Sequence, residues 1–358
     1  MPGENLSREE ARERAAILSV ERYDVALDVR SALGPAAGEG PRTFRSTTVI
    51  DFRCSRPGAS SFADLIAPAV TSVRLNGREL DPAEVFDGTR IALDDLAEQN
   101  TLVVDARCAY SRTGEGLHRF EDPEDGEVYL YTQYEPADSR RVFANFEQPD
   151  LKAPFTFRVT APEGWTVLSN GAQDGDPAPA EDGGSTVRFV PTRPISTYIT
   201  VIVAGPYHVE RDHYSRTLDG TDATDGDSAA GGKAVLDIPL SVLCRRSLAR
   251  HLDAAAIFDV TKRGLDFFHD SFDYPYPFGK YDQAFVPEYN LGAMENPGCV
   301  TFREELVFRG MVTRASYERR ANIVLHEMAH MWFGDLVTMR WWDDLWLNEG
   351  FEIGRAHV

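Results

Sequence analysis

The sequence predicts an α+β protein with two main parts, an antiparallel β domain followed by an α/β domain. Between residues 20 and about 205, apolar side chains recur at every second position, and turn signals separate short segments. From about residue 206, apolar residues recur at helical spacing instead. The chain has 358 residues, of which 42% are hydrophobic, and this is enough for two domain-sized cores.

The first elements are a short helix and a set of strands. Ser7 and Glu10 form a capping-box pattern, which predicts a polar helix in the N-terminal extension. Two strands follow, in which the alternating residues are Tyr23, Val25, Leu27 and Val29, and then Phe44, Thr48, Ile50 and Phe52. The pairs Asn76-Gly77 and Asn170-Gly171 have the composition of tight hairpin turns.

The second part begins with a helix candidate at Arg246–Phe272, and a second candidate spans Ala315–Val337. Between these helices, the segments 281–290 and 298–308 are rich in β-formers and are expected to be strands. The second helix carries both histidines of the motif HEMAH.

Composition narrows the classes of partner and compartment. The net charge is −20 with no basic patch, which argues against nucleic acid and anionic lipid as partners. The four cysteines are scattered without a paired spacing, as expected of free thiols in a reducing compartment. The N-terminus lacks an apolar signal region, and no apolar run reaches membrane-spanning length. We therefore expect a cytoplasmic protein that does not enter a membrane.

The motif HEMAH predicts a metal site. Residues four apart share one helix face, so His326 and His330 can bind one ion together. A catalytic zinc ion takes three protein ligands, and Glu349 in LNEG, on a following helix, is the natural third. Glu327 lies beside His326 and can act as the general base instead. The sequence thus predicts one Zn²⁺ per chain.

The bare five-residue pattern also occurs in ordinary helices, where histidines only satisfy core hydrogen bonds. Glu349 at the expected distance makes that explanation much weaker. Three tryptophans in the same stretch, Trp332, Trp342 and Trp346, are expected to pack in the core around the helix pair.

The motifs GAMEN (Gly292 to Asn296), HEMAH and WLNEG occur in this order and spacing. The chain thereby resembles the aminopeptidase N (alanyl aminopeptidase) family of gluzincin zinc metallopeptidases, over its whole length. The resemblance implies an N-terminal β saddle domain and a thermolysin-like catalytic domain. The expected boundaries are 1–17 for the helical extension, 18–205 for the saddle domain and 206–352 for an incomplete peptidase domain.

The resemblance also implies residues that bind the substrate. Glu295 matches the glutamate that binds the α-ammonium group, and Gln133 and Glu135 in YTQYEP match further anchors for that group. The backbone of Gly292 and Ala293 would hold the peptide in extended form. The full set of expected substrate contacts is Gln133, Glu135, Gly292, Ala293, Met294, Glu295 and Asn296.

The end of the chain departs from the family pattern after Phe351. We expect residues 353–358 not to be native, and relatives to continue well past this point. The family's oxyanion-stabilising tyrosine would then lie beyond the chain. The 358-residue chain alone is accordingly expected to be poorly active or inactive.

The expected function is hydrolysis of the N-terminal residue from peptides with a free N-terminus, with broad specificity for residues such as Ala, Lys and Leu. Two alternatives stay open. An epoxide hydrolase of the related branch is disfavoured by GAMEN, because that branch usually has glycine in place of Ala293. A non-catalytic scaffold of the same fold is disfavoured by the intact motifs.

Overall fold

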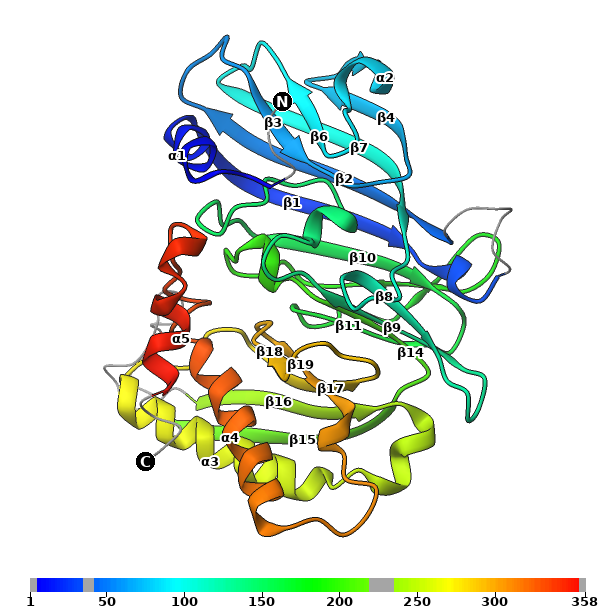
Figure 1. Ribbon diagram of the computed structural model, residues 1–358, viewed down its shortest axis with the longest axis vertical. Coiled ribbons are helices and arrows are strands. Elements are labelled where there is room, and N and C mark those ends of the chain that lie inside the picture. The colour runs from blue at the N-terminus through cyan, green and yellow to red at the C-terminus, as the bar shows by residue number, and fades with distance from the viewer. Residues whose placement is uncertain (1–4, 35–41, 219–234, 354–358) are drawn as a thin grey trace. The chain divides into compact units, whose positions relative to one another are not determined.

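The computed structural model describes residues 5–34, 42–218 and 235–353 (Figure 1). The chain divides into two compact units. Unit 1 comprises Met1–Pro206 and Thr338–Leu347, and unit 2 comprises Tyr207–Val337 and Asn348–Val358. Unit 1 consists mainly of strands, whereas unit 2 combines a sheet with helices, so the predicted α+β class is confirmed. The tail expected over 353–358 lies outside the described residues, apart from Ile353 at the end of a helix.

Unit 1 contains an eight-stranded sheet in the order β12-β13-β10-β1-β2-β7-β4-β5. Its neighbouring strands are antiparallel except for β1 and β10, which run parallel. The strands are β1 (Leu18–Asp28), β2 (Thr43–Cys54), β4 (Ala69–Leu75), β5 (Arg78–Leu80), β7 (Gln99–Ala109), β10 (Phe155–Ala161), β12 (Ala178–Pro179) and β13 (Ser185–Arg188).

A four-stranded antiparallel sheet, in the order β11-β14-β9-β8, and a two-stranded sheet of β3 and β6 complete the strands of unit 1. These strands are β3 (Ser61–Asp64), β6 (Arg90–Leu93), β8 (Gly116–Glu121), β9 (Val128–Gln133), β11 (Thr166–Ser169) and β14 (Ile202–Gly205). The helices of the unit are α1 (Arg8–Ile17), α2 (Pro82–Val85) and the 3-10 turns η1 (Arg30–Ala32), η2 (Ser139–Arg141), η3 (Thr197–Ile199) and η6 (Trp342–Asp344).

The period-two pattern correctly predicted the inward face of β1. Tyr23, Val25 and Leu27 are buried, and the ring of Tyr23 stacks on that of Phe155 with centroids 4.4 Å apart. The expected hairpin at Asn76-Gly77 is also present, because both residues adopt positive φ between β4 and β5.

The hairpin expected at Asn170-Gly171 is wrong. The side chain of buried Asn170 donates to the carbonyl of Ile199 at 2.9 Å and accepts from the amide of Val201 at 2.9 Å. A Cβ at Gly171 would lie 2.3 Å from the carbonyl oxygen of Val190. The pair therefore holds two backbone segments close together and makes no reversal of one strand.

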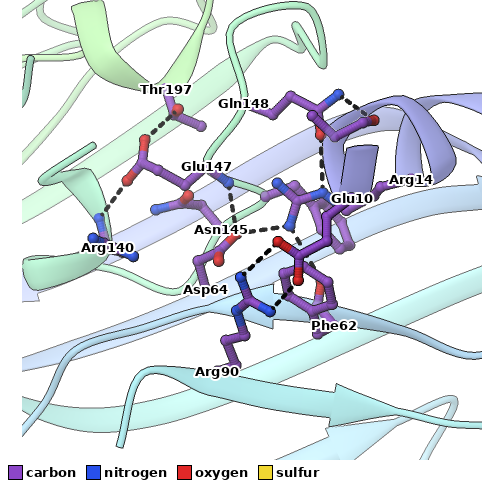
Figure 2. A network of polar contacts seen from close by, with 12 residues as sticks. Glu10, Arg14, Phe62, Asp64, Arg90, Arg140, Asn145, Glu147, Gln148 and Thr197 are labelled. Carbon is purple, nitrogen blue, oxygen red and sulfur yellow. Dashed lines mark hydrogen bonds and ion pairs between the residues drawn. The ribbon is translucent and has the colours of Figure 1, made fainter. Parts of the chain in front are cut away.

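Helix α1 is fixed to unit 1 by a buried ion pair. Its capping box between Ser7 and Glu10 is present as predicted. The helix buries a face that includes Arg14, whose guanidinium pairs with Asp64 at 2.7 Å and donates to Gln148 at 3.0 Å. Figure 2 shows these contacts continuing through Asp64, which also accepts a hydrogen bond from the amide of Glu147. An arginine that is 2% exposed therefore connects the N-terminal helix to strand β3.

The carboxyl group of Glu147 lies at the far end of the same network (Figure 2). It accepts hydrogen bonds from the Thr197 hydroxyl at 2.7 Å and the Arg140 amide at 2.8 Å. Burial nevertheless raises the pKa of Glu147 from 4.5 to about 7, because the charged form loses its hydration.

This shift makes the stability of the folded chain depend on pH. Between pH 4.5 and 7, folded Glu147 holds a proton that the unfolded chain releases. Raising the pH across this window should therefore lower the free energy of unfolding, by up to about 3 kcal/mol. Below and above the window the two states carry the same charge at this group, so its contribution stops changing. Urea unfolding from pH 4.5 to 8 measures the slope, and Glu147→Gln should flatten it; an equal slope in the variant would contradict the assignment.

Unit 2 contains a five-stranded sheet in the order β15-β16-β17-β19-β18. Strands β16, β17 and β19 run parallel, whereas β15 and β18 are antiparallel to their neighbours. The elements are β15 (His208–Thr217), β16 (Val235–Cys244), η4 (Arg246–His251), α3 (Ala254–Phe272), β17 (Tyr281–Val286), β18 (Ala293–Met294), β19 (Cys299–Arg303), η5 (Glu304–Leu306), α4 (Arg314–His330) and α5 (Trp346–Ile353, begun in unit 1).

The core of unit 2 lies where α3 and α4 pack together with the sheet. Trp332 is buried among Phe268, Phe272 and Tyr276, as expected, and its indole donates to the carbonyl of Tyr274 at 3.0 Å. The same expectation is wrong for Trp346, which is 70% exposed at the start of α5. All four cysteines are buried free thiols, as the scattered spacing predicted. None of the described helices is long and apolar enough to cross a bilayer.

Candidate metal centre

The candidate centre starts from the last turn of α4. Thr313 caps this helix by accepting from the amide of Ser316 at 3.3 Å. The helix packs closely on α3 because Gly264 has no side chain, and a Cβ there would lie 2.5 Å from Leu325. This packing holds the face of α4 on which His326 and His330 point the same way, with their Nε2 atoms 3.2 Å apart.

Helix α5 brings the third expected ligand to the same place. Carboxylate oxygens of Glu349 lie 3.6 Å from Nε2 of His326 and 3.8 Å from Nε2 of His330. The donor atoms of these three side chains all lie within 4.8 Å of one another. Two imidazoles and one carboxylate are the ligand set that a catalytic zinc ion takes, so the residues fit this metal.

The electrostatics of His326 and Glu349 agree with a cation between them. Burial, together with the smaller effect of the neighbouring His330, lowers the pKa of His326 to about 4, so His326 is neutral near pH 7. Burial raises the pKa of Glu349, and the charge of Glu295 acts in the same direction, while His330 opposes them. Each of these groups would regain favourable interactions from a bound metal ion.

The ring of His330 is oriented by the turn that ends α4. Its Nδ1 lies 3.2 Å from the carbonyl oxygen of Phe333, which favours a proton on Nδ1 and leaves Nε2 as the metal donor. The helix ends at His330, not at Val337 as predicted, because Gly334 follows with φ of +127°. The apolar spacing past His330 belongs to this turn, which the sequence pattern alone could not distinguish from a further helical turn.

Gly334 should matter for metal affinity because it lies against both metal-bearing helices. A Cβ there would lie 3.3 Å from the side chain of Asn348 and 3.4 Å from Nδ1 of His330, at a φ that favours glycine. We expect Gly334→Ala to weaken zinc binding by about tenfold or more, as changes behind a ligand commonly do. Competition with a chromogenic chelator measures the affinity. Gly310→Ala is the control, since a Cβ at Gly310 meets nothing within 4 Å; equal zinc affinity in the two variants would contradict this role.

Two further carboxylates face the same histidine. Glu295 and Glu327 are 4% and 5% exposed, and together with His330 they form a second group whose donor atoms lie within 4.8 Å of one another. Glu327 belongs to α4 itself, whereas Glu295 follows β18 directly. The structure thus brings together five of the residues expected from the sequence, namely Glu295, His326, Glu327, His330 and Glu349.

The remaining residues of GAMEN shape the strand before Glu295. Arg303 donates its amide to the carbonyl of Gly292 at 3.1 Å, so the next residue, Ala293, turns its own amide and carbonyl away from β19. Strand β18 is the last strand in the described part of this sheet, so these groups face its outer edge. Met294 is buried, and the side-chain Nδ2 of Asn296 donates to the Thr301 hydroxyl at 3.2 Å, which holds the following turn.

Gln133 and Glu135 belong to unit 1. Gln133 is the buried last residue of β9, opposite Gly116 of β8, and Glu135 lies two residues further on, before a cis proline. Their expected role in binding the substrate amine stays a prediction. The residues to which the sequence assigned no role are Phe333, Gly334 and Asn348; Asn348 lies within WLNEG, and Gly334 is a glycine shortly after the second histidine.

Two protein-family models match separate parts of the chain, and both describe M1 peptidases. Residues 82–199 match the peptidase M1 N-terminal domain, and residues 256–354 match the peptidase family M1 domain. The chain is 54% identical to aminopeptidase N of Streptomyces lividans over 352 residues, which is 98% of this chain and 38% of that protein.

More distant relatives have similar names. Human aminopeptidase N is 36% identical over 243 residues, which cover 66% of this chain and 23% of that protein. The mitochondrial aminopeptidase 2 of Saccharomyces cerevisiae is 37% identical over 238 residues, covering 65% of this chain and 22% of that protein. The chain thus spans less than two fifths of the length of these relatives.

Proposed function

Because the chain belongs to peptidase family M1, we propose that it carries the zinc site of an aminopeptidase that removes the first residue from peptides with a free N-terminus. The observation that carries this proposal is the convergence of His326, His330 and Glu349 within 4.8 Å. The names of the relatives, which are aminopeptidases, support the same reaction.

The metal-binding residues would be His326, His330 and Glu349, holding one zinc ion. When bound, zinc supplies a Lewis acid that polarises the scissile carbonyl and lowers the pKa of water. Glu327 lies one residue from His326 on the same helix and is not needed as a ligand. Its buried carboxylate accepts the proton of the attacking water and returns it to the leaving amine.

Glu295 would restrict cleavage to the first peptide bond of the substrate by binding its α-ammonium group. Its carboxylate has an oxygen, Oε1, with no hydrogen-bond partner among the described residues, although the side chain is 4% exposed. A buried carboxylate oxygen without a hydrogen-bond partner suits a cationic group such as the substrate's α-ammonium. The amide and carbonyl of Ala293 on the outer edge of β18 suit an extended peptide backbone. We propose that Gln133 and Glu135 add further contacts to the ammonium group.

The test compares alanyl p-nitroanilide with its N-acetylated form, in the presence of one equivalent of zinc. Because the chain spans 38% of the Streptomyces relative, the assay uses the 358-residue chain and a second form extended past Phe351. An aminopeptidase releases product only from the free amine, and removal of zinc by a chelator abolishes the release. Cleavage of both substrates would point to another hydrolase, and zinc binding without cleavage by either form would favour the non-catalytic scaffold.

A further inference from the structure

Two sets of possible metal ligands overlap at His330. The first set, His326, His330 and Glu349, is the zinc set proposed above. The second set consists of Glu295, Glu327 and His330, whose donor atoms also lie within 4.8 Å of one another. All three members of this second set are buried. His330 is the one residue that both sets contain.

The second set favours a cation for a reason of its own. Oε1 of Glu295 is buried and has no hydrogen-bond partner among the described residues. The neighbouring Glu327 brings a second buried carboxylate to the same place. Two such carboxylates repel each other and have lost much of their hydration, and a cation between them would relieve both costs.

We propose that Glu295 and Glu327 form a second site for a divalent cation, next to the zinc set. A ring nitrogen of histidine binds one ion at a time, so an ion in the first set leaves the second ion two carboxylates and water. The second ion must therefore bind more weakly than the first and load only when metal exceeds one equivalent per chain. The ions of paired metal sites commonly lie about 3.5–4 Å apart, which the compactness of the two sets permits.

Because only His330 belongs to both sets, replacing His326 and replacing His330 should affect metal affinity differently. Replacing His326 disables the first set but leaves the second one complete, with one imidazole and two carboxylates. Replacing His330 removes a ligand from both sets. We therefore expect His326→Ala to retain one zinc ion, with at least tenfold higher affinity than His330→Ala. A single zinc site would instead lose similar affinity in both variants.

Calorimetric titration of the metal-free chain with zinc tests the proposal directly. The wild type should take up one ion tightly and one weakly. Glu295→Gln should lose only the weak step, and Glu327→Gln serves as a second variant with the same expectation. Glu305→Gln is the control, since Glu305 is an exposed carboxylate of the same unit paired with Arg303. The proposal would be overturned if the wild type took up a single ion or if Glu295→Gln still took up two. Equal zinc affinity of His326→Ala and His330→Ala would also overturn it.

The second ion should compete with the α-ammonium group of the substrate, because Glu295 would hold either one. This consequence rests on the proposed function, whereas the titration does not. Excess zinc should raise KM for alanyl p-nitroanilide and leave kcat unchanged, with KM doubling at the metal concentration that half-fills the weak step. A fall in kcat at constant KM would exclude this competition. If no peptidase activity exists, the titration still decides whether the second site does.

Discussion

Glu327→Gln is expected to lower kcat of the proposed peptidase by about 1,000-fold, within the range that general-base catalysis commonly contributes. The amide keeps the shape of the side chain but cannot accept a proton from water. The buried position of Glu327, 5% exposed and within reach of His330, leaves bulk water a poor substitute for the missing base. The tight zinc ion should stay bound, because Glu327 is not in the first ligand set.

Zinc content and kcat must therefore be measured on the same preparation. Glu318→Gln is the matched control: it lies on the same helix, is exposed, and pairs with Arg314 at 2.8 Å. The control should retain both zinc and rate. If Glu327→Gln lost the tight zinc ion together with the rate, Glu327 would be a ligand and the assignment of the base would be wrong.

The parts of the centre that could be predicted from the sequence are those that local geometry determines. His326 and His330 meet because helical spacing alone brings residues four apart together. Glu349 needed more than spacing, since its position depends on how α5 lies against α4. The resemblance carried by WLNEG provided that information, and the distances of 3.6 and 3.8 Å to the histidines agree with it.

What the sequence could not show depends on contacts between distant segments. The end of α4 at His330 follows from the backbone of Gly334, which the apolar spacing up to Val337 concealed. Asn170-Gly171 has hairpin composition, yet it serves a close approach to Val190 from another part of the chain. The overlap of two ligand sets at His330 requires Glu295, which comes from the loop after β18.

The ion pair between Arg14 of α1 and Asp64 is another contact between distant segments. Breaking it has the largest expected effect on the stability of the chain. Arg14→Leu should lower the free energy of unfolding by about 3–5 kcal/mol, the usual cost of breaking a buried ion pair. Both side chains of the pair with Asp64 are 1% exposed, so the remaining carboxylate would be buried without its cation. The guanidinium also lies over the ring of Phe62 at 4.8 Å, and leucine cannot replace that cation–π contact. Urea unfolding followed by circular dichroism measures the change.

The same helix contains an internal control. Arg8 pairs with Asp343 at 3.3 Å, but both side chains are more than 60% exposed, so Arg8→Leu should cost less than about 1 kcal/mol. The double variant Arg14→Leu with Asp64→Leu separates charge from packing, because it removes both charges and should be less destabilised than the sum of the single variants. An additive double variant would mean that Arg14 acts through its contacts with Gln148 and Phe62 and not through Asp64. Either result identifies which contacts of the buried Arg14 fix the polar N-terminal helix to the rest of unit 1.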